Sequence, residues 1–456
     1  MKKYYLAIDI GASSGRHIVG WIENGILKTQ EVYRFSNGTE SKGGHLVWNM
    51  KRLFSEIICG LKKAKETDKI PAYIGIDTWA VDYALLDKED KLISEVYAYR
   101  DSRTIKSADA VHRKIPFNEL YKRTGIQYQP FNTIYQLYAD KLSGKTDKAE
   151  SFLMLPDYLN FLLTGVKKQE YTNATSTGLV NAETHGWDGN ILEILGFNKK
   201  LFGELSQPQT VVGALKKEVA EEIGYDATVI LPATHDTASA VLAAPLDEES
   251  PYISSGTWSL LGIEQTAAHT DEESRKANYS NEGSIDYKFR YQKNIMGLWM
   301  IQSVKRELGG NITFANLADM AKCKENKITV DVNDQRFLSP KNMTAEIKKA
   351  VTSNLGTASI MRVIYDSLAK SYAEAIEELE RNTGKTYKTL NIIGGGSRDA
   401  FLNELTAKAT GKKVITGPTE ATAIGNLIIQ MISAGEIKDL TSARQIIKKS
   451  FEVKEI

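Results

Sequence analysis

The chain is poor in cysteine, with two in 456 residues, Cys59 and Cys323. Two cysteines this far apart form no disulfide framework, and they do not have the spacing of a zinc site. We therefore expect both thiols to be reduced and to have a structural role.

An excess of charge of one sign is also missing. Lys and Arg total 58 and Asp and Glu total 57, so the formal net charge is +1. Such a balance gives no general attraction for nucleic acid or anionic lipid. There is no apolar run of about eighteen residues, and the chain starts in an apolar strand without a basic leader segment. We expect a cytoplasmic protein with a small-molecule partner, and neither a nucleic acid nor a membrane as partner.

The sequence contains neither a complete P-loop nor a complete dehydrogenase fingerprint, two motifs that bind phosphate groups. SGKT at Ser143–Thr146 and TGKT at Thr383–Thr386 resemble the end of a P-loop, but its earlier glycine is Ala139 in one and Leu379 in the other. GASSG also begins a dehydrogenase fingerprint, yet His17 stands where that motif needs glycine, and no Tyr-x-x-x-Lys pair occurs. A bound phosphate group would therefore have to be held in another way.

The most informative segment that is present is LAIDIGASSGR, at Leu6–Arg16. An apolar strand ends in an acid and leads into a loop of small residues. Gly11 and Gly15 permit close backbone approach and unusual φ and ψ angles, while two serines and Arg16 add donors and charge. This composition suits a bound phosphate.

Asp9 does not fit phosphate binding alone, because a carboxylate repels a phosphate unless a cation lies between them. The cation that suits one carboxylate, phosphate oxygens and retained waters is Mg²⁺. The segment therefore predicts a site for a metal-nucleotide complex. The same residues could also form only a tight hairpin turn, and this segment by itself leaves both interpretations open.

At this length the chain is expected to form two domains, with a boundary near Ala243–Glu249. The first half predicts an antiparallel meander that turns at Asn24-Gly25, a dipeptide typical of a type I′ hairpin. A helix from about Asn49 to Glu66 follows, then the strand AYIGIDT, and then VDYALLD, which is predicted to alternate inward and outward. The order of these elements indicates an α/β fold that is not a plain Rossmann repeat.

The second half repeats the strand-turn-strand pattern at Tyr252–Glu264, with Gly256-Thr257 at the turn. Apolar residues at helical spacing then predict a long helix that ends at Gly384. The strand LNII leads into Gly394–Gly396, where a flat or charged group could approach the backbone, and a helix follows. The two similar loops suggest distantly duplicated halves.

Asp236 is the candidate for acid-base chemistry. It lies in ATHDTASAVLAAP, between an apolar run and a stretch of small residues that begins a helix. There it could accept a proton from a substrate hydroxyl whose oxygen attacks a γ-phosphate. A helix N-cap, which contributes about 1 kcal/mol, explains the same residue equally well. His235 is interpreted as a substrate contact only because Asp236 is adjacent.

DIGASSGR, HDT, SSGTWSLLG and GGGS, in this order, resemble the FGGY family of sugar kinases, whose fold is similar to that of actin and Hsp70. The resemblance covers nearly the whole chain. It implies an α/β fold of two ribonuclease H-like domains with the active site in the cleft between them. Residues 1–244 would bind sugar and phosphate and supply the base, and residues 245–456 would bind nucleotide.

Within the family, the similarity is greatest to members that act on L-rhamnulose, through segments such as GIDTWAVDYALLD (75–87), LPDYLNFLLTG (155–165) and NIMGLWMIQ (294–302). It implies that ATP and L-rhamnulose give L-rhamnulose 1-phosphate and ADP, in a monomer or homodimer. A kinase for fuculose, xylulose or glycerol is the alternative. An actin-like ATP switch without kinase activity is a further alternative.

The resemblance also implies roles for individual residues. Asp236 would be the general base, and Asp9 would lie near Mg²⁺. The ATP contacts would be Ala12, Ser13, Ser14, Gly15, Arg16, Thr257, Gln302 and one of Gly394, Gly395 and Gly396. The sugar contacts would be His235, Asp236, Thr237, Asn294 and the backbone at Ala80. Family members more often have glycine at the position of Ala80, and the added methyl group could narrow the pocket.

Overall fold

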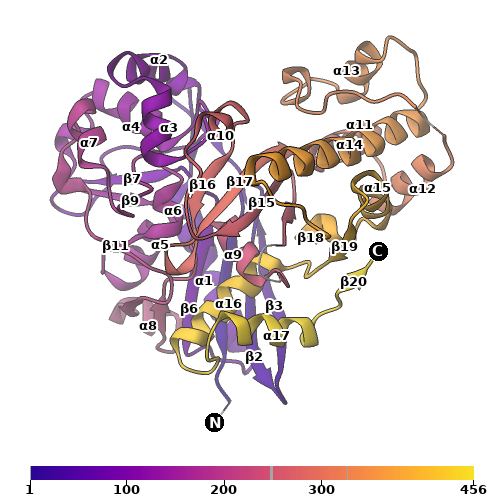
Figure 1. Ribbon diagram of the computed structural model, residues 1–456. Helices are drawn as coiled ribbons and strands as arrows, with labels where there is room; N and C mark the ends of the chain where they lie inside the picture. Colours follow the sequence, from indigo (N-terminus) through magenta and orange to yellow (C-terminus); the bar gives the residue numbers. More distant parts are fainter. Residues whose placement is uncertain (1, 247–249, 326) are drawn as a thin grey trace. The chain divides into compact units, whose positions relative to one another are not determined.

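The computed structural model describes residues 2–246, 250–325 and 327–456 (Figure 1). The chain forms two compact units, each made of separate stretches. Unit 1 comprises residues 1–243, 265–291 and 422–450, and unit 2 comprises residues 244–264, 292–421 and 451–456. The expected division into residues 1–244 and 245–456 stays a prediction, and two stretches of its second part lie in unit 1.

Unit 1 is built on a six-stranded sheet of order β12-β13-β6-β1-β2-β3. β1 pairs antiparallel with β2 and parallel with β6, and β13 pairs parallel with β6. The β2–β3 hairpin turns at Asn24 (φ 54°) and Gly25 (φ 72°), which confirms the predicted meander. The strands are β1 (Tyr5–Ile10), β2 (Ser14–Glu23), β3 (Ile26–Ser36), β6 (Tyr73–Thr78), β12 (Val211–Ala214) and β13 (Thr228–Ile230).

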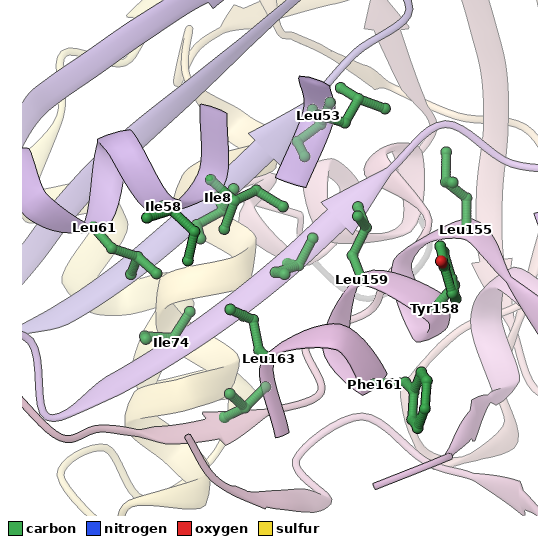
Figure 2. Close-up of a cluster of buried hydrophobic side chains, with 14 of the residues drawn as sticks. Ile8, Leu53, Ile58, Leu61, Ile74, Leu155, Tyr158, Leu159, Phe161 and Leu163 are labelled. Carbon is green, nitrogen blue, oxygen red and sulfur yellow. The ribbon is translucent and has the colours of Figure 1, made fainter. Parts of the chain in front are cut away.

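Helices pack against this sheet: α1 (Met50–Glu66), α5 (Leu155–Thr164), α8 (Lys217–Ile223), α9 (Asp236–Ala243), α16 (Ala421–Ser433) and α17 (Leu440–Ser450). The start of α1 was predicted, and the Asn49 side chain caps it by accepting a hydrogen bond from the Arg52 N–H at 3.0 Å. Figure 2 shows apolar side chains of α1 and α5 meeting those of β1 and β6, including Ile8 and Ile74. Because side chains alternate along a strand, the neighbouring residues of β1 and β6 face α16 instead.

Glycines allow α16 to come close to the sheet. A side chain at Gly75 would meet Asn426 and Gln430, and one at Gly20 would meet Leu427. The Gln430 Nε2 also donates to the Leu6 carbonyl at 3.0 Å. The sheet face that carries Asp9 is therefore covered by α16, through Asn426, Leu427 and Gln430.

The remaining elements of unit 1 lie outside the six-stranded sheet, and β7 is one of them. The side chains of VDYALLD were predicted to alternate inward and outward; they do alternate between two faces, but the outward face is wrong, because all four residues of β7 are buried. Tyr83 and Leu85 pack into one apolar cluster and Ala84 and Leu86 into another, so the strand has no solvent face. These elements are β4 (Glu40–Lys42), β5 (His45–Trp48), β7 (Tyr83–Leu86), β8 (Val96–Tyr97), β9 (Ser151–Met154), β10 (Gln169–Glu170), β11 (Leu205–Ser206), β16 (Ser280–Gly283), α2 (Ile105–Lys114), α3 (Phe117–Thr124), α4 (Thr133–Leu142), α6 (Tyr171–Thr175), α7 (Gly189–Leu195) and α10 (Glu272–Lys276).

The strands of unit 2 are neighbours in the order β17-β15-β14-β18-β19-β20, and residues 289–291 at the start of β17 belong to unit 1. β14 pairs antiparallel with β15 and parallel with β18, which pairs parallel with β19. In unit 1, β1 likewise pairs antiparallel with β2 and parallel with β6, which pairs parallel with β13, so the sheet topology supports related halves. The elements are β14 (Tyr252–Ser255), β15 (Trp258–Gln265), β17 (Phe289–Met296), β18 (Thr389–Ile393), β19 (Lys413–Thr416), β20 (Lys454–Glu455), α11 (Trp299–Leu308), α12 (Phe314–Lys322), α13 (Met343–Ala350), α14 (Thr357–Thr383) and α15 (Ala400–Thr410).

Two sequence expectations concern the surface of the molecule. Cys59 and Cys323 are free, but both are exposed, so the expectation of a structural role is wrong. Among the helices in the described ranges, none combines the length and apolar character that a bilayer crossing requires.

His17 makes the stability of unit 1 sensitive to acid. Its ring is fully buried against Gly60 of α1, and this burial lowers its pKa to about 3, although the nearby Ile57 backbone opposes the shift. The unfolded chain has an ordinary histidine pKa of about 6.5. Between these values the unfolded state binds a proton that the folded state excludes, so the free energy of unfolding falls as the pH falls.

We therefore expect the free energy of unfolding to depend less on pH in His17→Phe than in the wild-type protein. Relative to the variant, the wild-type protein should lose on the order of 4 kcal/mol of unfolding free energy between pH 7 and pH 3. Urea unfolding of both proteins across this range measures the difference, in which the other titrating groups cancel. Parallel curves for the two proteins would contradict the assignment.

Candidate active site

Three carboxylates lie at the carboxyl end of the parallel strands of unit 1. Asp9 on β1 is in register with Asp77 on β6, so both side chains have the same direction. Thr78, the next residue of β6, forms a parallel bridge with His235, which places Asp236 at the same edge. Ligands of open α/β sheets bind at this edge, beyond the carboxyl ends of the strands.

The segment around Asp9 forms a tight hairpin between β1 and β2. Ile10 pairs with Gly15, and the Gly11 N–H donates to the Ser14 carbonyl at 2.9 Å. Ala12 and Ser13 therefore form the tip, whereas Ser14, Gly15 and Arg16 already belong to β2. The hairpin interpretation describes the backbone, and phosphate contact at these residues stays a prediction.

The unusual backbone angles predicted for the two glycines are not found, because neither Gly11 nor Gly15 has a positive φ, while close approach of a phosphate to their backbone stays a prediction. Gly15 is needed for packing, since any side chain there would overlap the Phe35 ring.

Asp9 is paired within this hairpin. Its Oδ2 accepts a hydrogen bond from the Arg16 Nε at 2.9 Å, and only 5% of Asp9 is exposed. The guanidinium therefore holds this carboxylate at the end of β1.

Asp77 was missed in the sequence, although GIDT ends a strand in an acid just as AIDIG does. It is fully buried, and its Oδ2 accepts from the Asn426 Nδ2 at 2.6 Å. Its Oδ1 has no hydrogen-bond partner in the described part of the chain. Burial raises its pKa well above the usual value, and the charges of Asp9 and Asp236 add to this rise.

Asp236 is the first residue of α9. Its Oδ1 accepts from the Thr237 N–H at 2.5 Å and the Thr237 Oγ1 at 3.1 Å. A regular N-cap accepts from the second or third N–H instead, so these contacts differ from those of a simple cap. Burial raises its pKa, the neighbouring His235 opposes this, and the charge of Asp9 adds to it. Since 33% of the side chain remains exposed, a ligand can reach the carboxylate.

The predicted sugar contacts in unit 1 lie on two fixed segments. His235 and Thr237 flank Asp236 at the start of α9. Ala80 precedes Val81, which is buried with a φ of 69°, a strained value for a β-branched residue. Strain of this kind is typical of functional sites where the surrounding structure holds the backbone.

Asp82 holds the backbone at Ala80 and Val81 in place, and it was not among the site residues predicted from the sequence. It is buried, and its Oδ2 accepts from the Nε1 of Trp48 at 2.7 Å and the Nε1 of Trp79 at 2.9 Å. Its Oδ1 accepts from the Gln136 Nε2 at 3.1 Å. Burial raises its pKa to about 6, against the effect of these hydrogen bonds. The backbone at Ala80 is therefore presented by a rigid loop.

In unit 2 the predicted nucleotide contacts gather at the end of β14. Thr257 lies in the turn between β14 and β15, and its Oγ1 donates to the Oε1 of Gln302 on α11 at 3.4 Å. Gly394 has a φ of 79°, and a side chain there would lie against the Ser255 carbonyl. Gly396 is closer still, since a side chain there would overlap that of Ser255. The segment Gly394–Gly396 thus follows β18 directly beside β14.

Asn294, the remaining predicted sugar contact, lies on β17. Its Oδ1 is buried and has no hydrogen-bond partner among the described residues. A carbonyl oxygen in this situation is available to a donor from a ligand.

Unit 1 thus brings together Asp9, Arg16 and the segment His235–Thr237, and unit 2 brings together Thr257, Gln302 and Gly394–Gly396. The roles of all these residues, and a location of the active site between two domains, stay predictions.

Comparisons with known proteins show which family the chain belongs to. The N-terminal domain of the FGGY family of carbohydrate kinases matches residues 4–243, and its C-terminal domain matches residues 251–434. The rhamnulokinase of Oceanobacillus iheyensis is 48% identical, with 99% of this chain and 98% of that protein covered. The rhamnulokinase of Halalkalibacterium halodurans is 49% identical with the same coverage, and that of Bacillus subtilis is 43% identical, covering 99% of this chain and 94% of its own.

Solved structures with the same fold are more distant in sequence. Gluconate kinase from Lactobacillus acidophilus superposes with a TM-score of 0.81 at 19% identity, covering 100% of this chain and 93% of that one. Plasmodium falciparum glycerol kinase with ADP gives a TM-score of 0.78 at 16% identity, covering 99% and 94%. The actin-like α/β fold predicted from the motifs is confirmed. With both family domains matched in order over most of its length, the chain belongs to the FGGY family of carbohydrate kinases.

Proposed function

We propose that this carbohydrate kinase transfers the γ-phosphoryl group of ATP to L-rhamnulose, giving L-rhamnulose 1-phosphate and ADP. The observation that carries the mechanism is the accessible carboxylate of Asp236, held at the start of α9 beside His235. The substrate is supported by the rhamnulokinases of Oceanobacillus iheyensis and Halalkalibacterium halodurans, which are 48% and 49% identical to this chain.

In this mechanism Asp236 accepts the proton of the sugar hydroxyl while the hydroxyl oxygen attacks the γ-phosphorus. His235, Thr237, Asn294 and the backbone at Ala80 orient the sugar. Most of the acceleration in phosphoryl transfer comes from such positioning and from charge neutralisation. The raised pKa of Asp236 makes it a better proton acceptor than an ordinary carboxylate, provided that it remains ionised at the working pH.

The nucleotide contacts in this proposal come from both units. Residues Ala12–Arg16 of the first hairpin hold the phosphates. Thr257, Gln302 and the segment Gly394–Gly396 hold the remainder of ATP.

We further propose that ATP binds with Mg²⁺ near Asp9. Among the described residues no three His, Cys, Asp or Glu side chains are grouped to hold a metal. That fits Mg²⁺, which proteins commonly hold through one or two carboxylates together with nucleotide phosphates and water. The mutual repulsion of Asp9, Asp77 and Asp236, visible in the raised pKa of Asp77, is also what a cation would relieve. When bound, the ion would neutralise charge on the phosphates.

The proposal also covers the location of the protein in the cell and its oligomeric state. The exposed free thiols of Cys59 and Cys323 suit a reducing compartment, which supports a cytoplasmic location. The expectation of a monomer or homodimer stays a prediction.

A substrate panel tests the proposed function. With ATP and Mg²⁺, we expect kcat/KM for L-rhamnulose to exceed that for L-fuculose, xylulose or glycerol by at least about 100-fold, because a site that hydrogen-bonds one set of hydroxyls rejects others strongly. A higher kcat/KM for another sugar would make that sugar the proposed substrate instead of L-rhamnulose. ATP binding without phosphorylation of any sugar would instead favour an actin-like switch.

A further inference from the structure

The carboxylate of Glu170 links two segments of unit 1 that lie far apart in the sequence. Glu170 ends β10, and its side chain caps α6 by accepting from the Thr172 N–H at 2.8 Å and the Asn173 N–H at 3.0 Å. Its Oε2 also accepts from the Thr234 Oγ1 at 2.6 Å and the Thr234 N–H at 3.3 Å. Thr234 is 64 positions further along the chain and lies just before His235 and Asp236.

This link is deeply buried. Glu170, Thr172 and Thr234 are all fully buried. The carboxylate accepts five hydrogen bonds in total, the fifth from the Thr172 Oγ1 to Oε2 at 2.7 Å. Burial raises the pKa of Glu170, and the hydrogen bond from the Thr234 hydroxyl opposes this rise more than any of the others. Thr234 is therefore a principal partner of the buried charge.

Capping a helix does not by itself require this residue. The helix α6 has five residues, and short side chains such as Ser, Thr, Asp and Asn are the usual caps of such an end. A serine would cap it without bringing a charge into the interior, which is costly. Glutamate is one methylene longer than aspartate, and the additional length brings Oε2 to Thr234. The residue type therefore indicates a second role, at Thr234.

Thr234 forms the bend from which α9 and its first residue, Asp236, begin. The Thr234 carbonyl accepts from the Thr78 N–H at the end of β6 at 2.9 Å. The Ser239 N–H of α9 donates to the His235 carbonyl at 3.0 Å. Backbone hydrogen bonds thus hold the chain on both sides of the bend, and the buried carboxylate holds the side chain of Thr234.

The carboxylate of Asp236 contacts the two residues beside it. Its Oδ1 accepts from the Thr237 N–H at 2.5 Å and lies 3.4 Å from the Nε2 of His235. Thr237 belongs to the same helix, so this contact does not fix the carboxylate relative to the sheet. The His235 ring is held from another direction, since its Nδ1 lies 3.1 Å from the Oε2 of Glu282 and 3.2 Å from the Nη2 of Arg290, both of which are buried. The position of Asp236 therefore depends on how its segment is anchored.

We propose that Glu170 is a positioning residue for the phosphoryl transfer, which holds the bend at Thr234 so that the carboxylate of Asp236 stays within reach of the sugar hydroxyl. The proposal rests on the proposed function, in which Asp236 accepts the proton of that hydroxyl. A displacement of about 1 Å at a reacting group can cost about 100-fold in rate, so a loosened bend lowers kcat.

Thr234→Val is the first test, because valine keeps the shape of the side chain and removes its hydroxyl. We expect kcat to fall by about 10-fold and the KM for ATP to change by less than about twofold. Thr172→Val is the matched control, since it removes a hydroxyl that donates to the same Oε2 from α6 instead. Its kcat should stay within about twofold of the wild type, while Tm falls by a similar amount in both variants.

Thr234→Ser returns the hydroxyl and should restore kcat to within about threefold of the wild type. A purely structural role predicts equal losses of kcat in Thr234→Val and Thr172→Val, because both weaken the same buried carboxylate. Equal losses, or a near-normal kcat of Thr234→Val, would therefore overturn the positioning role.

A double-mutant cycle tests the link from its other end. Glu170→Gln keeps the size of the side chain and is expected to lower kcat by about 10-fold. Combined with Thr234→Val, it should lower kcat by no more than about threefold beyond the slower single variant, because both changes break one link. Effects that multiply would overturn the proposal.

Failure of the proposed function gives a different result. All variants are measured with the sugar that the substrate panel ranks first, so another substrate leaves this test unaffected. In Asp236→Asn, the further change Thr234→Val should alter the remaining rate by less than about twofold, because no base is left to position. Near-normal turnover of Asp236→Asn counts against the proposed base, whereas a further 10-fold loss in the double variant counts against the positioning role alone.

Discussion

Asp236→Asn is expected to lower kcat for ATP-dependent phosphorylation of L-rhamnulose by about 100- to 10,000-fold, the usual contribution of a general base. The amide has nearly the shape of the carboxylate and can still accept from Thr237, so α9 should begin as before. It cannot take the hydroxyl proton, and the transfer must then use water as the acceptor.

Steady-state kinetics with a coupled assay for ADP measure this effect, and ATP affinity measured separately should change little. Asp90→Asn is the control, because Asp90 is an exposed acid whose partner is Lys167 on the surface. Near-normal turnover of Asp236→Asn would remove the base assignment and leave Asp236 with a role in starting the helix.

Among the variants described, Gly425→Ala is expected to lower the free energy of unfolding the most. Gly425 of α16 lies against the backbone of Ser239 on α9, and an added methyl group would overlap the Ser239 carbonyl oxygen. A backbone atom cannot rotate away, so the two helices must separate. Overpacking of this kind costs about 3 kcal/mol, which corresponds to a fall in Tm of roughly 5 °C for a unit of this size.

The same variant should also lose activity, since α9 begins with Asp236 and α16 carries Asn426, which holds Asp77. Differential scanning calorimetry and kcat measured at a temperature well below Tm separate the two effects. Gly186→Ala is the matched control, because a side chain at Gly186 would meet open space. Equal Tm values for the two variants would contradict the packing argument.

The sequence was sufficient where structure is local. The turn at Asn24-Gly25, the start of α1 at Asn49 and the end of α14 at Gly384 all follow from residue types at fixed positions, and all three predictions are confirmed. The burial of β7 on both faces was missed, because two apolar clusters formed by distant segments cover it. The one local signal was its run of four apolar residues, Tyr83–Leu86, since strands buried on both faces tend to be continuously apolar.

The site was predictable to a similar extent. Asp9 and Asp236 were found because each follows an apolar run and precedes small residues. Asp77 has the same signal, but its partner Asn426 is 349 positions away. Glu282 and Arg290 carried no signal at all, because an acid and a base eight residues apart are typical of a solvated surface. Only the fold shows that they are buried behind His235.

The return of residues 422–450 to unit 1 has a consequence for synthesis on the ribosome. The helix α16 covers Gly20 and Gly75 and supplies the hydrogen bond to Asp77, yet it is among the last segments of this sequence to be made. The first 243 residues therefore emerge with one sheet face uncovered and a carboxyl group without its amide partner. Domains of many proteins fold in order as they are translated, but unit 1 must wait until nearly all of the sequence has left the exit tunnel. A ribosome that stalls before Asn426 would release an unfinished and aggregation-prone unit.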